Sequence, residues 1–115
     1  MNMIEFYEKI GGDFSATLER LGTETLIRRV VLKFPEDTSF PQLCEGFEKH
    51  DAETAFRGAH TLKGVCSNLG FDDLYATVYE LTEKLRGRTF DGAEPLFEET
   101  KAKYNAVVAA IAEIG

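Results

Sequence analysis

Residues 51–70 read DAETAFRGAHTLKGVCSNLG, and this stretch decides the fold. Small and apolar residues recur in it at spacings of three and four, the pattern of an amphipathic helix. Aspartate is a preferred residue at helix N-caps, and glycine commonly ends helices. The stretch therefore predicts a long helix between Asp51 and Gly70, with a buried side made of Ala52, Ala55, Ala59, Leu62, Cys66 and Leu69.

The helical period recurs along the rest of the chain, and no strand-like alternation of any length occurs. The predicted segments are 3–10, 14–21 behind Asp13, 24–34 behind Thr23, 40–47 behind Thr38 or Ser39, and 72–87. A last helix, with apolar residues from Leu96 to Ile114, is expected to begin behind Asp91, which has capping-box spacing with Glu94. Segments 24–34 and 40–47 can form one bent helix across Pro35.

Four of these helices are substantial, and short connections join them. Such helices most economically form an antiparallel up-down four-helix bundle. We expect an all-α fold with one domain over residues 1–115, in which residues 23–115 form the bundle. The short helices of residues 1–22 would pack over one end as a lid.

The composition excludes several classes of function. The formal net charge of −7 argues against a nucleic-acid binder, which would need clustered cations to neutralise phosphates. No apolar run approaches the roughly 18 residues that cross a bilayer, and no signal peptide is visible, so we expect a cytoplasmic protein without a membrane anchor.

The histidines and cysteines do not have the H-x-x-x-H or C-x-x-C spacing that would suggest a metal site. Cys44 and Cys66 are expected to be packed, reduced thiols, and His50 to be structural.

His60 lies on the side of the predicted helix opposite its buried stripe, because each residue advances about 100°. Its imidazole should therefore face solvent. Glu53, Arg57, Gly64 and Ser67 share this face at helical spacing, and Phe56 and Lys63 lie one row to the side. An unperturbed imidazole, with a pKa near about 6.5, offers a neutral nucleophilic nitrogen at neutral pH.

Gly64 is the unusual residue of this face, since glycine inside a helix costs about 1 kcal/mol relative to alanine. Without a Cβ, this position would let the backbone of another protein, or a bulky oxyanion, approach His60 closely. The ammonium of Lys63 can reach the same place and screen the negative charge of a phosphorylated ring nitrogen.

The segment A-H-T-L-K-G at residues 59–64, followed by Asn68, Leu69 and Gly70, resembles the signature of histidine phosphotransfer (HPt) domains. The wider layout resembles the same family over nearly the whole chain, with Leu21-Gly22 before the first core helix and Phe34 near its end. The resemblance implies that His60 accepts a phosphoryl group, that Lys63 supports it, and that Gly64 permits close approach of a receiver domain.

Further roles follow from the resemblance. Another polar or basic residue on the next helix often lies near the histidine in this family, and Arg86, Lys84 or Thr82 could serve here. We expect Phe56, Arg57, Ser67 and Arg86 to contact partners, and Val65 to offer apolar surface. The implied partners are response-regulator receiver domains and a sensor or hybrid histidine kinase. The protein itself would be a monomeric phosphoryl carrier rather than an enzyme, without a cofactor, and the Mg²⁺ would belong to the receiver.

Three other interpretations stay open. The chain could be the N-terminal phosphotransfer segment of a chemotaxis-type histidine kinase, although the start at Met1 and the last helix closed at Gly115 favour a complete small protein. It could be the dimerisation helix pair of a sensor kinase, where an acidic residue usually follows the histidine, but Thr61 follows here. It could also be a helical adaptor with a degenerate site that is no longer phosphorylated. The presence of His60, Lys63 and Gly64 argues against this interpretation.

Overall fold

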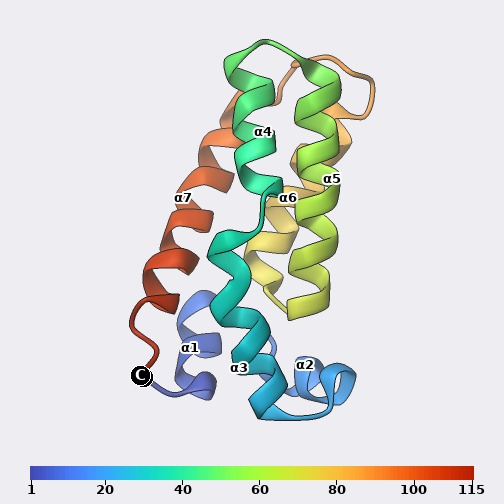
Figure 1. Ribbon diagram of the computed structural model, residues 1–115. Coiled ribbons are helices and arrows are strands. Elements are labelled where there is room, and N and C mark those ends of the chain that lie inside the picture. The colour runs from blue at the N-terminus through green and yellow to red at the C-terminus, as the bar shows by residue number, and fades with distance from the viewer.

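The chain folds into helices from end to end, as a computed structural model describing residues 1–115 shows (Figure 1). The fold is all-α, as predicted. The elements are α1 (Met3–Ile10), α2 (Phe14–Leu21), α3 (Glu24–Lys33), the 3₁₀ helix η1 (Phe34–Glu36), α4 (Ser39–Glu48), α5 (Ala52–Leu69), α6 (Asp72–Leu85) and α7 (Glu94–Ile111).

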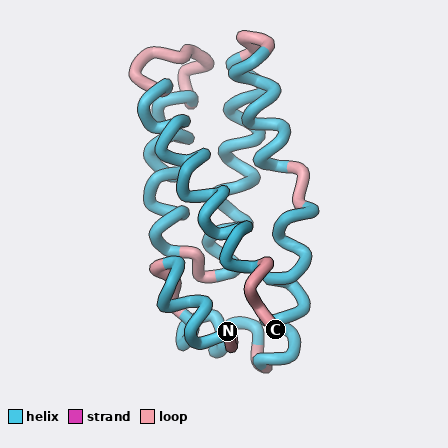
Figure 2. Tube along the Cα trace, turned by 90° about the vertical axis from the view of Figure 1, so that its left-hand side faces the viewer, coloured by secondary structure: helices cyan, strands magenta, loops and turns pink.

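The long helices run alternately up and down the molecule (Figures 1 and 2). The α3–η1–α4 column rises, α5 descends, α6 rises and α7 descends. The two short helices α1 and α2 lie at the lower end, where both chain termini meet (Figure 2). The terminal ammonium of Met1 donates a hydrogen bond of 3.1 Å to the carbonyl of Glu113. None of the helices combines the length and apolar character needed to cross a membrane.

Helix α5 has the predicted bounds and buried side. The Asp51 carboxylate accepts the backbone N–H of Thr54 at 3.2 Å, and Gly70 ends the helix in the left-handed conformation with φ 71°. Ala52 is only partly buried. The other five predicted residues, Ala55, Ala59, Leu62, Cys66 and Leu69, are buried. The amphipathic pattern and the capping residues therefore predicted the bounds of α5 correctly.

Two predicted details of the α3–α4 region differ from the structure. The segments do not form one bent helix, because η1 and two further residues separate them. The cap of α4 comes neither from the Thr38 nor from the Ser39 side chain: the Asp37 carboxylate accepts the Ser39 backbone N–H at 2.9 Å and also its hydroxyl. An aspartate two residues upstream competes for this N–H because its short side chain can turn back onto the following backbone.

The capping box predicted at the start of the last helix is also wrong. Helix α7 begins at Glu94 with Ala93 at the N-cap, and no side chain caps it. Ala93 is fully buried, and its N–H donates to the carbonyl of Phe90 at 3.0 Å. The intervening turn contains Gly92 with φ 71°, so the chain enters the helix two residues later than Asp91 would require.

Helices α4 and α5 pack through two glycines. A Cβ on Gly58 of α5 would lie 2.4 Å from the backbone nitrogen of Leu43 in α4. Reciprocally, a Cβ on Gly46 of α4 would lie 2.3 Å from the backbone nitrogen of Ala55 in α5. The two backbones therefore approach each other at a distance that a side chain at either position would prevent.

The N-terminal helices do more than cover one end of the bundle. Met3, Phe6 and Tyr7 of α1 are at most 1% exposed and belong to the main hydrophobic core. Edge-to-face contacts join the Phe6 ring to those of Tyr7 and Phe71, with centroids 5.4 and 5.9 Å apart. The apolar positions of residues 3–7 thus anchor α1 in the core.

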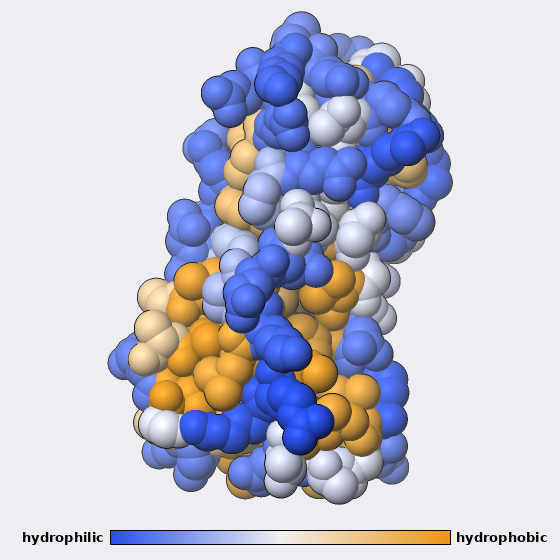
Figure 3. All heavy atoms as spheres, viewed as in Figure 1, coloured by the Kyte–Doolittle hydropathy of each residue, from blue (hydrophilic) through white to orange (hydrophobic).

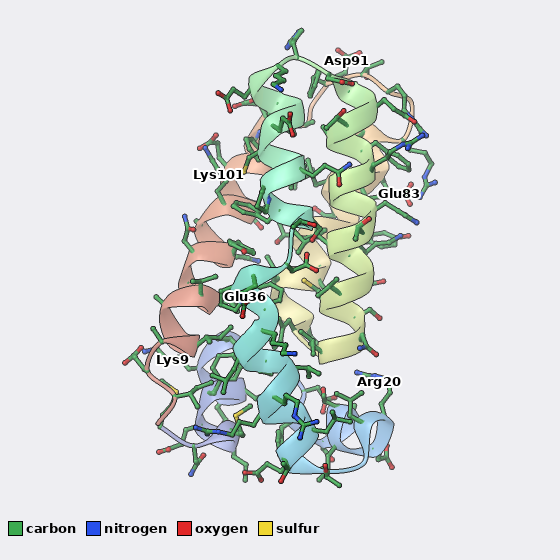
Figure 4. All side chains as sticks on the ribbon, in the orientation of Figure 1. Lys9, Arg20, Glu36, Glu83, Asp91 and Lys101 are labelled. Atoms are coloured by element: carbon green, nitrogen blue, oxygen red, sulfur yellow. The ribbon has the colours of Figure 1, made fainter.

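Side chains from α1 and α2 also bind the carboxyl end of α5. The Tyr7 hydroxyl donates to the carbonyl of Leu69 at 2.6 Å, and the Thr17 hydroxyl donates to the same oxygen at 3.1 Å. Arg20 donates to the carbonyls of Ser67 and Asn68 at 3.0 and 3.1 Å, and Figure 4 shows it reaching toward the lower end of α5. The last carbonyls of a helix lack partners within the helix, so these contacts stabilise this end of α5.

Apolar side chains gather on the lower half of the surface in Figure 3, on both sides of the α3 column. One of these areas includes a groove between α3 and α5 that contains Val30, Phe34, Val65 and Leu69. Both cysteines are free thiols, Cys66 buried and Cys44 partly buried. Burial raises the pKa of the Cys66 thiol to about 12.

Candidate functional site

His60 is exposed at the middle of α5 and opposite its buried side. It sits one turn after Phe56, and the two rings are nearly parallel, at 18°, with centroids 5.8 Å apart. The predicted orientation of His60 toward solvent is therefore present in the structure.

Gly64 lies one turn beyond His60 and is also exposed. A Cβ built on this glycine would have no heavy atom within 4 Å. Helix packing therefore does not explain the glycine. What the position provides is open backbone surface beside the imidazole, which a larger side chain would cover.

Lys63 is partly buried and lies toward α6. Its ammonium is 5.4 Å from the centroid of the Tyr79 ring, within the range of a cation–π contact. Tyr79 is 44% exposed, so it forms part of the surface and not of the core. The Lys63 ammonium is therefore held next to the Tyr79 ring of α6.

Phe56 is 8% exposed, less than a partner-binding residue on an open face would be. The guanidinium carbon of Arg88 lies 3.9 Å from its ring centroid, and that of Arg86 lies at 5.4 Å. The ring therefore contributes little exposed surface. The ring belongs to the hydrophobic core, and the two cations and the His60 ring lie against its outer part.

Of the three candidates on the following helix, only Arg86 lies near this group of residues. Thr82 is fully buried, and its hydroxyl donates to the carbonyl of Val78 at 2.7 Å. The Lys84 ammonium lies against the loop at Gly92, 3.6 Å from the position of a Cβ there. Arg86 caps the end of α6, within cation–π range of Phe56.

Arg88 was not singled out by the sequence. It follows the end of α6, in the left-handed region with φ 59°. No helical period applies there, so nothing in the sequence connects it with α5. Its guanidinium nevertheless returns to α5, where it forms an ion pair with Glu53 and lies over Phe56.

Carboxylates hold several of the cations on this face. Glu53 pairs with Arg88 and, at 3.0 Å, with Arg57, and Glu83 pairs with Arg86 at 2.9 Å. The hydrogen bonds from Arg88 and Arg57 lower the pKa of the Glu53 carboxyl, and that from Arg86 lowers the pKa of Glu83. Figure 4 shows Glu83 beside α5. With Lys63, this face carries four cations against two carboxylates, a local positive excess on an acidic protein.

Two other predicted residues lie apart from His60. Ser67 is exposed two turns further along the same face, and its carbonyl accepts the hydrogen bond from Arg20. His50 is in the left-handed conformation after α4, with its ring stacked on Phe90 at a centroid distance of 4.9 Å. The structure contains no group of three or more His, Cys, Asp or Glu side chains that could hold a metal ion.

A family model described as Hpt domain matches residues 16–110 of this all-helical chain. The chain belongs to the Hpt domain family. Hpt domains are phosphocarrier modules of two-component phosphorelays, in which they interact with kinases and receiver domains. Searches of curated proteins and of solved structures gave no match.

The match to the Hpt domain begins inside α2 and ends near the end of α7. It contains all of α5 and α6 and the residues that follow α6, and therefore His60, Lys63, Gly64 and Arg86. Membership gives this chain a phosphotransfer role in a phosphorelay.

Proposed function

We propose that the protein carries a phosphoryl group on His60 and exchanges it with the active aspartates of receiver domains. The observation that supports this proposal best is the pairing of an exposed His60 with the open backbone at Gly64, one turn away on the same helix. His50 has no comparable surroundings, since its ring is stacked on Phe90.

The transfer is a displacement at phosphorus. The lone pair of a neutral imidazole nitrogen attacks the phosphorus of the aspartyl phosphate, the phosphorus–oxygen bond breaks, and the aspartate leaves as a carboxylate. The reverse step restores the imidazole. In this proposal the receiver supplies the aspartate and the Mg²⁺, so the protein is a carrier whose chemistry depends mainly on its partner.

Two features of this chain would assist the reaction. The local excess of cations on the His60 face, with Lys63 three residues after the histidine, would stabilise the charge of the phosphoryl group. The absence of a side chain at Gly64 would let a receiver bring its aspartate close to the imidazole. Arg57 and Ser67 would meet the partner at the edges of this contact.

The proposal can be tested without knowing the natural kinase. Phosphoramidate, a small phosphoryl donor, is incubated with the wild type and with His60→Gln, and the product is followed by ³¹P NMR and mass spectrometry. We expect one phosphoryl group per wild-type chain, labile to acid, and none on His60→Gln. The matched control is His50→Gln, which replaces the other histidine and should be labelled like the wild type.

A receiver domain with Mg²⁺ is then added to the labelled protein. Loss of the label from His60, with its appearance on the receiver aspartate, is the expected result. Labelling that persists in His60→Gln, disappears in His50→Gln or resists acid would remove His60 as the carrier. Because the replaced side chain is exposed, the free energy of unfolding of His60→Gln should stay within about 0.5 kcal/mol of the wild-type value.

A further inference from the structure

Arg88 has an unusual backbone. It is one of two non-glycine residues with positive φ, and a left-handed conformation costs free energy for a residue with a long side chain. Its backbone N–H donates to the carbonyl of Leu85 at 2.8 Å, which closes the turn after α6. This turn directs the side chain toward α5, where it contacts the helix while it stays partly exposed to solvent.

The guanidinium of Arg88 makes three contacts. It forms an ion pair with the Glu53 carboxylate, its Nη1 donates to the Arg86 carbonyl at 2.6 Å, and its carbon lies 3.9 Å from the centroid of the Phe56 ring. A planar guanidinium can donate in its plane while stacking on an aromatic ring. These contacts hold Arg88 and Phe56 against each other.

Phe56 in turn contacts the histidine. The nearly parallel rings of Phe56 and His60 lie one helical turn apart, with centroids separated by 5.8 Å. An exposed side chain with no neighbour distributes over the staggered χ1 rotamers, whereas a ring packed beside it restricts that distribution. The orientation of the His60 imidazole therefore depends on where the Phe56 ring is held.

We propose that Arg88 is a positioning residue: anchored by Glu53, it holds the Phe56 ring in place and thereby keeps the His60 imidazole in one orientation for phosphoryl transfer. The proposal rests on the proposed function of His60. It assigns no contact between Arg88 and the phosphoryl group, because its guanidinium is occupied by Glu53 and Phe56.

Arg86 is less suited to this positioning role. Its guanidinium carbon is 5.4 Å from the Phe56 centroid, and its side chain is held by Glu83 of its own helix. Glu83 and Arg86 are three residues apart on α6, so their pair makes no connection to α5. Arg88 and Glu53, in contrast, connect the turn after α6 with the helix that carries the histidine.

The test compares Arg88→Gln with Arg29→Gln, the same substitution at an exposed arginine of α3. The three-bond couplings between Hα and Hβ of His60, measured by NMR on the unphosphorylated protein, report its rotamer populations. We expect one dominant rotamer in the wild type and in Arg29→Gln, and averaged couplings in Arg88→Gln. Glu53→Gln, which removes the anchor and leaves Arg88 intact, should shift the couplings in the same direction.

The rate of labelling by phosphoramidate then measures the functional effect. If the imidazole spreads over the two χ1 rotamers that an α-helix allows, of which one is productive, the rate in Arg88→Gln should fall to about one half. Arg88→Gly is the second variant, since glycine adopts positive φ without strain and so removes the side chain while preserving the turn. It should show the same averaged couplings and the same reduced rate.

Unchanged His60 couplings in Arg88→Gln and Arg88→Gly, or altered couplings with an unchanged labelling rate, would overturn the positioning role. Failure of the proposed function would look different: the wild type itself would not be labelled on His60. In that case the couplings would still show whether Arg88 orients the ring.

Discussion

Gly58 and Gly64 lie on the same helix, six residues apart, in opposite surroundings. A Cβ on Gly58 would collide with the backbone of α4, at 2.4 Å from the Leu43 nitrogen and 2.9 Å from the Ser39 oxygen. A Cβ on Gly64 would meet no atom within 4 Å. The first glycine is explained by packing inside the protein, and the second is not.

The comparison shows how α5 serves two purposes. Both glycines carry the same intrinsic cost of roughly 1 kcal/mol in a helix. At Gly58 the close contact of two helices offsets this cost, because α4 and α5 can approach each other along their backbones. At Gly64 nothing in the folded chain offsets it, so a compensating gain would have to come from what docks beside His60.

The largest effect is expected from Gly58→Ala. The added methyl group would have to displace the α4 backbone, since no flexible side chain is there to move aside. We expect a loss of about 3 kcal/mol in the free energy of unfolding, measured by urea denaturation followed by circular dichroism. Gly46→Ala, on the reciprocal side of the same contact, should lose a similar amount. A loss below about 1 kcal/mol at both positions would mean that the two helices can separate without penalty.

The carboxyl end of α5 provides an intermediate case, because side chains from α1 and α2 hold it. Tyr7→Phe removes one of the two hydroxyls that donate to the Leu69 carbonyl and leaves the Thr17 bond in place. We expect a loss of about 1 kcal/mol in the free energy of unfolding. The rate of His60 labelling should not change, since the Leu69 carbonyl that Tyr7 binds lies about two and a half turns of α5 away from that residue.

The same tyrosine predicts a pH dependence. Burial raises the pKa of Tyr7 to about 12, above its value of about 10 in an unfolded chain. The folded state therefore favours the protonated phenol. Its contribution is complete below pH 10 and is lost as the pH rises from 10 to 12. The advantage of the wild type over Tyr7→Phe in melting temperature should shrink and then reverse over this range. Ionisation favours the unfolded chain by about 2 kcal/mol at pH 12, which is more than the hydrogen bond contributes. A difference that stays constant with pH would contradict the raised pKa of Tyr7.

The sequence predicted the main helices because their ends are marked by local chemistry. Asp13, Thr23 and Asp51 each accept the capping hydrogen bond expected from them. The prediction failed at Asp91 and Glu94, whose spacing fits a capping box although the helix starts later, after a turn that buries Ala93. The spacing of two residues cannot show which residue of a turn will be buried in the core, and so it cannot fix where the helix begins.

The candidate site was predicted in part for a similar reason. His60, Lys63 and Gly64 lie on one helix, so a period of 3.6 residues places them correctly relative to one another. Gly58 could have been recognised too, since it lies between Ala55 and Leu62 at spacings of three and four, on the buried side. Arg88 could not: its approach to Phe56 depends on a left-handed residue after α6 and on the packing of two helices.

The smallest effect on stability is expected at Gly64, where the sign should be opposite to that at Gly58. Gly64→Ala and Gly64→Gln both replace glycine by a better helix former in open space. Each should therefore gain up to about 1 kcal/mol in the free energy of unfolding. If either variant were destabilised like Gly58→Ala, the surface around Gly64 would be less open than the structure indicates.

The two Gly64 variants differ in what they place beside the histidine, and this difference tests the reason for the glycine. Labelling of His60 by phosphoramidate, a small donor, should be nearly the same in both variants as in the wild type. Transfer from His60 to a receiver domain should be slower in Gly64→Gln than in Gly64→Ala, because the longer side chain occupies the space that the receiver backbone needs. Transfer at the wild-type rate in Gly64→Gln would show that close approach does not explain the glycine, and that α5 tolerates its cost for another reason.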